Sequence, residues 1–514
     1  MIPESVFEGY SLRIENRTNR VYVAQNGTRA AYDACLRALA AEGFAEKERF
    51  ESDRWCYAAL LREDTGVFLN YYSETGDLRA AVEEHCAYFS YADAPADRTV
   101  SPQITQIPLE DYGMSYAVRL SDGRFVIFDG GWNFAPDAER LYACLQDGSQ
   151  GRAPIVAAWI LTHAHRDHYQ CFLGFMERYG DAVTVEKVLL SFPEADDPAY
   201  EKDFSYVDRR VPDSDERTNI PRLWHAIASC GAVAYTAHTG QRYRMGDADC
   251  LVLSSFDDVV GDTANINATS LVIRMELGGQ VILWTGDAAF GICRLPQRYG
   301  ADLKADILQV PHHGFQSGPW EDEILGYDRI RPSVCLLPVS DHNAYTAFCI
   351  HRRGTRHLMQ NCDVSEFIAA SSLRTLTLPY VPAPYGKAEL ARNCAEGLAA
   401  CGAKCWIFTG LSTASPSDFV FDFLNTTYLK PNLNAEIYFE DRTKRILHVR
   451  FSLPPTCTKS VNVVGDEVDG DALWFNEYAL KTQPIPENAP FSLRITSDLP
   501  IVVSHPDHAP AYHA

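Results

Sequence analysis

The chain has 514 residues, of which 46% are hydrophobic and 22% charged, a composition typical of a folded globular protein. Its net charge of −22 at pH 7 disfavours non-specific attraction to nucleic acid or to anionic membranes, so a nucleic acid is expected only as a substrate. The sequence has no apolar run of about 18 residues, no recognisable signal peptide and no C-x-x-C pair among its 15 cysteines, which predicts a protein with no membrane span and with reduced thiols, in the cytoplasm.

The first region, residues 1–98, is predicted to be an α+β accessory domain. Apolar residues recur at helical spacing between Thr28, a suitable N-cap, and Gly43, a suitable stop. The runs WCYAALL and VFLNYY that follow are typical of strands. A stretch rich in Ala, Asp and Pro, YADAPADRTVSP, then indicates a linker.

The second region, residues 99–382, repeatedly places polar residues directly after an apolar, strand-like run. The most concentrated example is His163, His165 and His168, three imidazoles within six positions. Each ring needs partners for both of its nitrogens, and a metal site would satisfy the three rings together. Ligands at the ends of rigid strands are held more accurately than ligands on free loops, so we expect these strand ends to converge on one site. The residues in question are Asp129, the H-x-H-x-D-H cluster His163, His165, Asp167 and His168, then Asp287, then His312 and His313, and finally His342.

The order of D-G-G, H-x-H-x-D-H and T-G-D resembles the metallo-β-lactamase superfamily. The run NATSLVIRMELGGQVILWTGD, followed by ADILQVPHHG, is similar to a narrower branch, the hydrolase domain of the bacterial competence protein for DNA internalisation. The resemblance covers about residues 100–382 and implies an αββα sandwich with one or two metal ions at its edge. The expected fold class is therefore α/β: an αββα metallo-β-lactamase sandwich with an N-terminal α+β domain and a C-terminal β-sandwich.

The resemblance also implies roles for the ligand residues. His163 and His165 would bind a first ion, and Asp167 and His168 a second. Asp287 would bridge the two ions, because a carboxylate has two oxygens to share. Nitrogen and oxygen ligands without thiolate suit two zinc ions, with manganese or iron as alternatives.

Two further residues are expected to support these ligands without binding metal. Asp129 would orient ligands from outside the coordination sphere, although the D-G-G segment could instead form only a tight turn. Asn267 lies in NATS, the place where most of the superfamily has a third histidine, and is expected to act in the same supporting way.

The third histidine of the superfamily is the main departure. His238 in AHTG imitates it, but lies too far before the bridging aspartate, so a structural role is expected for it. We expect His313 to complete the first site, because the following glycine frees the backbone to approach. His312 would then face the substrate, and His312 and Asp167 are the expected catalytic residues. His342 is expected to complete the second site, an ordinary loop histidine being the alternative.

The third region, residues 383–514, consists mostly of short strand candidates and is predicted to be a β-sandwich. From about Lys404 it resembles the sensory rhodopsin transducer family, on LNT at 424–426, YFEDR at 438–442 and SD-x-PIVVSH at 497–505. That resemblance implies small-molecule binding and a homo-oligomer formed through this region.

Together these features predict a metal-dependent hydrolase that uses a metal-bound hydroxide. Phosphodiester or phosphate-ester substrates are favoured by the resemblance to the competence protein. A carboxyl-derivative hydrolase acting on a lactone, thioester or β-lactam is one alternative, because the same hydroxide attacks a carbonyl. A small-molecule sensor or scaffold with an inactive hydrolase domain is the other.

Overall fold

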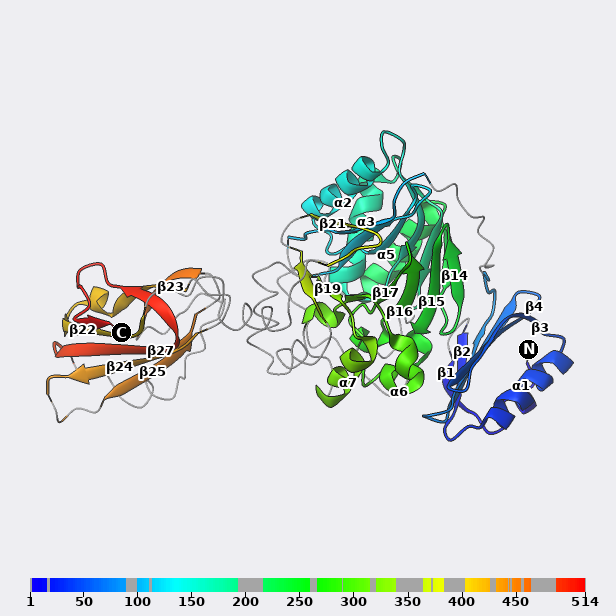
Figure 1. Cartoon of the computed structure of the whole chain (residues 1–514), viewed down its shortest axis with the longest axis horizontal. Helices are drawn as coiled ribbons and strands as arrows, with labels where there is room; N and C mark the ends of the chain where they lie inside the picture. The colour runs from blue at the N-terminus through cyan, green and yellow to red at the C-terminus, as the bar shows by residue number, and fades with distance from the viewer. Residues whose placement is uncertain are drawn as a thin grey trace. The chain divides into compact units, whose positions relative to one another are not determined.

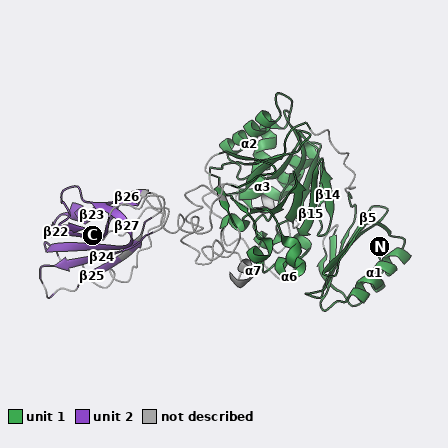
Figure 2. Cartoon of the chain, in the orientation of Figure 1, with its two compact units in different colours: residues 1–344, 357–385 green, residues 345–356, 386–514 purple. Residues whose placement is uncertain are grey.

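The computed structural model describes residues 2–15, 19–88, 99–110, 113–192, 216–258, 266–288, 290–314, 320–338, 364–370, 373–382, 403–425, 431–441, 443, 446–453, 457–463 and 487–513. These residues divide into two compact units, the first made by residues 1–344 and 357–385 and the second by residues 345–356 and 386–514 (Figure 2). The described residues of the first two predicted regions thus lie in one unit. The predicted boundaries at 98 and 382 adjoin segments outside the described residues and stay predictions.

The N-terminal region is a six-stranded antiparallel sheet with one helix on its face (Figure 1). The helix α1 (Arg29–Ala41) begins where predicted, because Thr28 Oγ1 accepts a hydrogen bond from the Ala31 N–H, and Gly43 follows its end at φ 87°. Its buried residues, among them Tyr32 and Leu39, pack on the sheet. The strand order is β1 (Ser11–Glu15), β2 (Asn19–Ala24), β6 (Asp77–Glu83), β5 (Thr65–Tyr72), β4 (Trp55–Arg62) and β3 (Ala45–Glu51), and a short 3-10 turn η1 (Glu4–Phe7) precedes them.

The central region has two sheets that enclose one core. In the core, Trp284 of the second sheet stacks on Phe128 of the first sheet, with 4.2 Å between the ring centroids. Trp284 also lies edge-on to Tyr116, which belongs to the first sheet as well. The first sheet has the order β13 (Val233–Thr236), β12 (Lys187–Leu190), β10 (Ile155–Ile160), β9 (Phe125–Asp129), β8 (Ser115–Arg119), β7 (Gln103–Gln106) and β21 (Arg374–Thr377), with β11 (Thr184–Val185) beside β10. The second has the order β14 (Arg242–Met245), β15 (Ala248–Ser254), β16 (Val272–Leu277), β17 (Gln280–Trp284), β18 (Ile307–Gln309), β19 (Val334–Leu337) and β20 (Glu366–Ala369).

Helices cover the outer faces of these sheets, which gives the expected αββα layers. A second core joins the first sheet to α2 (Ala135–Gly148), α3 (Arg166–Tyr179) and α5 (Glu216–Ser229). The helices α6 (Leu295–Tyr299) and α7 (Trp320–Ile330) lie beside the second sheet (Figure 1). The described 3-10 turns here are η3 (Phe256–Asp258), η4 (Ile266–Thr269), η5 (Gly300–Leu303) and η6 (Pro311–Gly314).

The second compact unit is built from strands, as predicted. The 15-residue strand β27 (Pro490–Ser504) pairs with strands on both sides of one core that includes Phe408, Phe423 and Ile437. The other elements are β22 (Ala403–Ser412), η8 (Pro416–Phe419), β23 (Val420–Asn425), β24 (Asn432–Phe439), β25 (Leu447–Ser452), β26 (Cys457–Asn462) and β28 (Tyr512–His513). Across both units, none of the helices that the structure describes is long and apolar enough to span a membrane.

The face of the N-terminal sheet opposite α1 packs on the central region through polar groups. Arg298 is only 1% exposed; its Nη1 lies 3.0 Å from Asp258 Oδ1, its Nε lies 3.7 Å from Asp77 Oδ2, and its guanidinium lies over the Tyr72 ring. Asp77 and Tyr72 belong to the N-terminal sheet, whereas Arg298 and Asp258 belong to the central region. The buried cation therefore joins the two regions.

His238 makes a second buried bridge in this contact. Its Nε2 lies 3.2 Å from Glu83 Oε2 of the N-terminal sheet, its Nδ1 bonds Asp257 of η3, and its ring stacks on Phe68 at 4.1 Å. Burial by itself lowers the pKa of His238, but the two carboxylates outweigh burial and raise it to about 10. His238 is therefore an imidazolium at neutral pH and has the structural role expected for it.

We expect Arg298→Met to destabilise the first unit by up to about 3–5 kcal/mol, because the change removes a buried cation and leaves Asp258 with Arg79 at 3.7 Å and Asp77 with Arg294 at 3.2 Å. Arg274→Met is the matched control, since Arg274 pairs with the exposed Glu276 and such pairs contribute about 0–1 kcal/mol. Urea unfolding followed by tryptophan fluorescence measures both variants. Equal midpoints for the two would contradict the buried bridge.

His238 gives a prediction for the pH dependence of stability. Its pKa is raised from about 6.5 in the unfolded chain to about 10 in the folded one, so its stabilising contribution is complete below pH 6.5 and is lost as the pH rises through 10. The stability difference between wild type and His238→Gln should therefore shrink by up to about 1.4 kcal/mol per pH unit across this window. Urea titrations at pH 6, 8 and 10 measure it. His225→Gln, at an exposed histidine, should show no such trend.

Candidate metal centre

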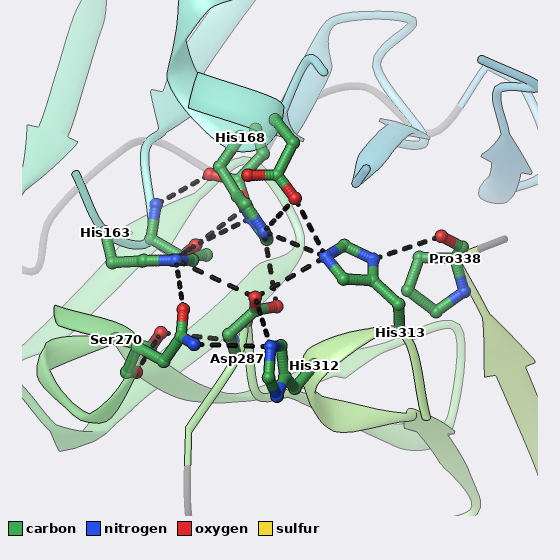
Figure 3. Close-up of polar contacts among 12 residues, drawn as sticks. His163, His168, Ser270, Asp287, His312, His313 and Pro338 are labelled. Carbon is green, nitrogen blue, oxygen red and sulfur yellow. Dashed lines mark hydrogen bonds and ion pairs between the residues drawn. The ribbon is translucent and has the colours of Figure 1, made fainter. Parts of the chain in front are cut away.

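Strand ends from both sheets bring the motif residues together. Strands β9 and β10 run parallel, and so do β17 and β18, so within each sheet the carboxyl ends of the two strands lie at the same edge. Asp129 ends β9, the H-x-H-x-D-H cluster follows β10 and opens α3, Asp287 follows β17, and His312 and His313 follow β18. Figure 3 shows the side chains of His163, His168, Asp287, His312 and His313 gathered around one point. The expected convergence of strand ends is confirmed for these four segments.

Four buried side chains form the first of two donor groups. Asp167, His168, Asp287 and His313 each place one donor atom within 4.8 Å of the others. His168 Nε2 lies 3.3 Å from His313 Nε2, 3.2 Å from Asp287 Oδ1 and 3.6 Å from Asp167 Oδ2. His313 Nε2 lies 3.0 Å from Asp167 Oδ2 and 3.4 Å from Asp287 Oδ2. We call these four residues the carboxylate-rich group.

The second donor group consists of His163, His165 and Asp287, again within 4.8 Å of one another. His163 Nε2 lies 3.8 Å from Asp287 Oδ2 and 3.1 Å from Asn267 Oδ1. His163 is fully buried, whereas His165 is partly exposed. We call these three residues the imidazole group; it shares Asp287 with the carboxylate-rich group, as expected for a bridging carboxylate.

Asp129 supports the ligands from beneath. Its backbone adopts φ 54°, which is unfavourable for a residue with a side chain. Its Oδ1 accepts a hydrogen bond from the Thr162 N–H, and its Oδ2 accepts from Thr162 Oγ1 and from His168 Nδ1, all at 2.7 Å. This is the geometry expected of a residue that orients a ligand, and it goes beyond a simple turn.

The hydrogen bonds also locate the protons on three imidazole rings. His168 Nδ1 donates to Asp129, and His313 Nδ1 lies 3.2 Å from the Pro338 carbonyl, which can only accept (Figure 3). Thr162 uses its one hydroxyl proton on Asp129, so it accepts from His163 Nδ1 at 3.1 Å. Each ring in its neutral form therefore presents an Nε2 lone pair toward the carboxylates.

Lone pairs and carboxylates that converge in this way require a positive charge between them. Burial lowers the pKa of His313, yet Asp287 and Asp167 raise it to about 9. Burial by itself raises the pKa of Asp167, and His168 and His313 hold it well below its usual value. The surroundings thus favour a cation, either a proton or a metal ion.

The spacing of the donors fits a metal ion. A tetrahedron of donors about 2.0–2.1 Å from its centre has edges of about 3.3–3.4 Å. The separations that involve His168 or His313 run from 3.0 to 3.6 Å, with Asp287 contributing Oδ1 toward His168 and Oδ2 toward His313. Imidazole nitrogen and carboxylate oxygen are ligands of divalent transition metals. The residues therefore fit divalent metal binding, and the assignment of individual ligands stays a prediction.

The structure corrects the predicted division of the neighbouring histidines. His313 lies in the carboxylate-rich group with Asp167 and His168, whereas it was expected to join His163 and His165. Both His312 and His313 adopt left-handed backbone conformations, and this turn sets the directions of their two side chains. His312 lies instead beside Asn267, the neighbour of His163.

Two further histidines were singled out in the sequence, His238 and His342. His238 bonds Glu83 and Asp257, apart from both donor groups. His342 lies outside the described residues. Thr162, which sequence reasoning missed, bonds Asp129 and His163; its position directly before the histidine cluster, at the end of an apolar run, was the available signal.

Comparison with known proteins gives three further findings. ComE operon protein 3 of Bacillus subtilis (strain 168) is 25% identical over 188 residues, which are 37% of this chain and 20% of that protein, so the match spans about a fifth of the relative. The metallo-beta-lactamase fold protein YhfI from Bacillus subtilis is 12% identical, covering 53% of this chain and 98% of that chain at a TM-score of 0.31. The Anabaena sensory rhodopsin transducer is 27% identical, covering 21% of this chain and 97% of that chain at a TM-score of 0.16.

The family comparison agrees with the motifs and with the layers of the central region. Residues 109–324 match the model of the metallo-beta-lactamase superfamily, and this range contains the described members of both donor groups together with Asp129 and Asn267. The chain therefore contains a domain of the metallo-beta-lactamase superfamily.

Proposed function

We propose that the central region is a metal-dependent hydrolase that cleaves a phosphodiester or phosphate ester. The observation that carries the proposal is the convergence of three Nε2 lone pairs and two carboxylates at one edge of the sandwich. The preference for a phosphoester rests on the run from NATS through TGD to PHHG, which resembles the hydrolase domain of the competence protein.

The donor groups indicate which residues would hold metal. His168, His313, Asp167 and Asp287 would hold one ion, and His163, His165 and Asp287 the other. Zinc suits these nitrogen and oxygen donors, and manganese or iron are alternatives. A divalent ion here supplies Lewis acidity and lowers the pKa of a water that it binds to roughly 7.

The chain's own residues would position the reacting groups. Burial by itself raises the pKa of Asp167, but His168 and His313 lower it, so Asp167 is an ionised carboxylate at neutral pH and can attract a cation or orient a polar group of the substrate. His312 is 24% exposed at its side chain, and His165 is also partly exposed, so these rings line the open side of the site. A ring in the position of His312 can contact a substrate oxygen on which negative charge develops.

Asp129 and Thr162 hold the ligand rings ready for this role. Asp129 fixes the proton of His168 directly and, through the Thr162 hydroxyl, that of His163. Ligand rings with a fixed tautomer lose less freedom when they bind metal, and hydrogen bonds of this kind raise metal affinity.

A substrate screen tests the proposal. The full-length protein is supplied with zinc or manganese and offered a chromogenic phosphodiester, a phosphomonoester and a lactone. Turnover of either phosphate substrate supports the proposal. Turnover of the lactone alone would favour carboxyl-derivative hydrolysis, and binding of a small ligand by a protein that turns over none of the three would favour the sensor.

We expect Asp287→Asn to lower metal content and to reduce turnover by about 10³-fold or more, because one substitution removes a charged donor from both groups. Elemental analysis and turnover on the same samples measure the change. Asp147→Asn, at an exposed position of α2, serves as the control and should match wild type. Full metal content and activity in the Asp287 variant would refute the assignment.

We expect Thr162→Val to weaken metal affinity about 10–100-fold with the fold retained, because valine keeps the shape but removes the hydroxyl that links Asp129 to His163. Thr162→Ser restores that hydroxyl and should restore the affinity. Competition with a chromogenic chelator measures both variants. If serine and valine behave alike, the hydroxyl has no role in positioning His163.

A further inference from the structure

The two donor groups differ in charge and in burial. The carboxylate-rich group has two carboxylates and two imidazoles, and all four residues are buried. The imidazole group has only the shared carboxylate of Asp287 and two imidazoles, one of them partly exposed. Without another donor, an ion bound by the imidazole group would have three protein ligands. Only one of these is a carboxylate, against two in the carboxylate-rich group.

Asn267 lies where a further donor for the imidazole group would be needed. Its Oδ1 is 3.1 Å from His163 Nε2, a separation like those within the carboxylate-rich group. Ser270 fixes its place, because the Ser270 hydroxyl donates to the Asn267 carbonyl at 2.8 Å and accepts from the Asp287 N–H at 3.1 Å. The backbones of Asn267 and Asp287 are thereby tied to one side chain.

His312 sets which end of the Asn267 amide faces the site. Asn267 Nδ2 lies 3.2 Å from His312 Nε2, and because an amide nitrogen only donates, His312 Nε2 accepts. The amide oxygen therefore points to His163 Nε2, which also presents a lone pair because its proton is on Nδ1. Two acceptors 3.1 Å apart are held together well only by a cation between them.

We propose that Asn267 is a direct ligand in the imidazole group, that His312 is a positioning residue for its amide, and that the two ions consequently load in order. The carboxylate-rich group fills first and tightly, because it offers more negative charge in a more buried place. The imidazole group fills second and more weakly, because a neutral amide oxygen replaces an imidazole or a carboxylate. This inference rests on the proposed metal-dependent function.

The order of loading is measured by adding zinc chloride to the metal-free, full-length protein in competition with chromogenic chelators. Wild type should bind two ions with dissociation constants that differ at least about tenfold. Asn267→Ala should weaken only the second event, by about tenfold or more, and Asn267→Asp should tighten that same event by adding a charge. His313→Ala should weaken the first event.

The role of His312 is tested by comparing the effect of His312→Ala on zinc binding in two backgrounds, wild type and Asn267→Asp. In the wild-type background, His312→Ala should weaken the second event, because the amide can then turn its nitrogen toward His163. In the Asn267→Asp background the same change should have little effect, since the two oxygens of a carboxylate are equivalent. His225→Ala, at an exposed histidine of α5, is the matched control and should leave both events unchanged. Thermal melts of the metal-free variants confirm that each one folds.

Three outcomes would overturn the inference: equal affinity for the two ions, an Asn267→Ala variant that binds both ions like wild type, or a His312→Ala effect of equal size in both backgrounds. These outcomes are separate from failure of the proposed function, because the titration contains no substrate. A protein that loads two ions in the stated order but hydrolyses none of the substrates overturns the proposed function alone.

Discussion

The site depends on one buried carboxylate, that of Asp129. Its two oxygens accept three hydrogen bonds, from the Thr162 backbone, the Thr162 hydroxyl and His168 Nδ1. Its bond to His168 determines which nitrogen of that ring presents a lone pair to the centre. Through the Thr162 hydroxyl it does the same for His163. A carboxylate is suited to this task because it only accepts, so every neighbour must turn a donor toward it. The strained backbone of Asp129 is the cost of placing it there.

The layered fold makes that arrangement rigid. Parallel pairing of β9 with β10 and of β17 with β18 sets two strand ends of each sheet at one edge, and the core around Trp284 and Phe128 fixes the two sheets against each other. The donor atoms are therefore held at close range by the fold. Placing carboxylates and lone pairs so close together is unfavourable by itself. The favourable packing of the surrounding core offsets this repulsion.

The N-terminal sheet is joined to this domain by charges rather than by an apolar surface alone. Arg298 and His238 each lie between carboxylates from both regions, and both are buried. Their partners Asp257 and Asp258 belong to η3, which comes before η4 and Asn267 in the chain.

Periodicity and motif spacing were enough to predict the helix at 29–41, the strands β4, β5, β9 and β17, and the residues that gather at the sheet edge, because these depend on local preferences and on short-range order. The grouping of the ligands could not be predicted in the same way. Which donor group His313 joins depends on the left-handed turn of Pro311–Gly314. The role of Asn267 depends on contacts with residues more than 40 positions away. The burial of His238 between Glu83 and Asp257 likewise depends on how two regions pack. The sequence by itself determined the fold class and the kinds of ligand, whereas the pairing of ligands and the positions of their protons were decided only by the tertiary structure, because both depend on distances between segments that are remote in the chain.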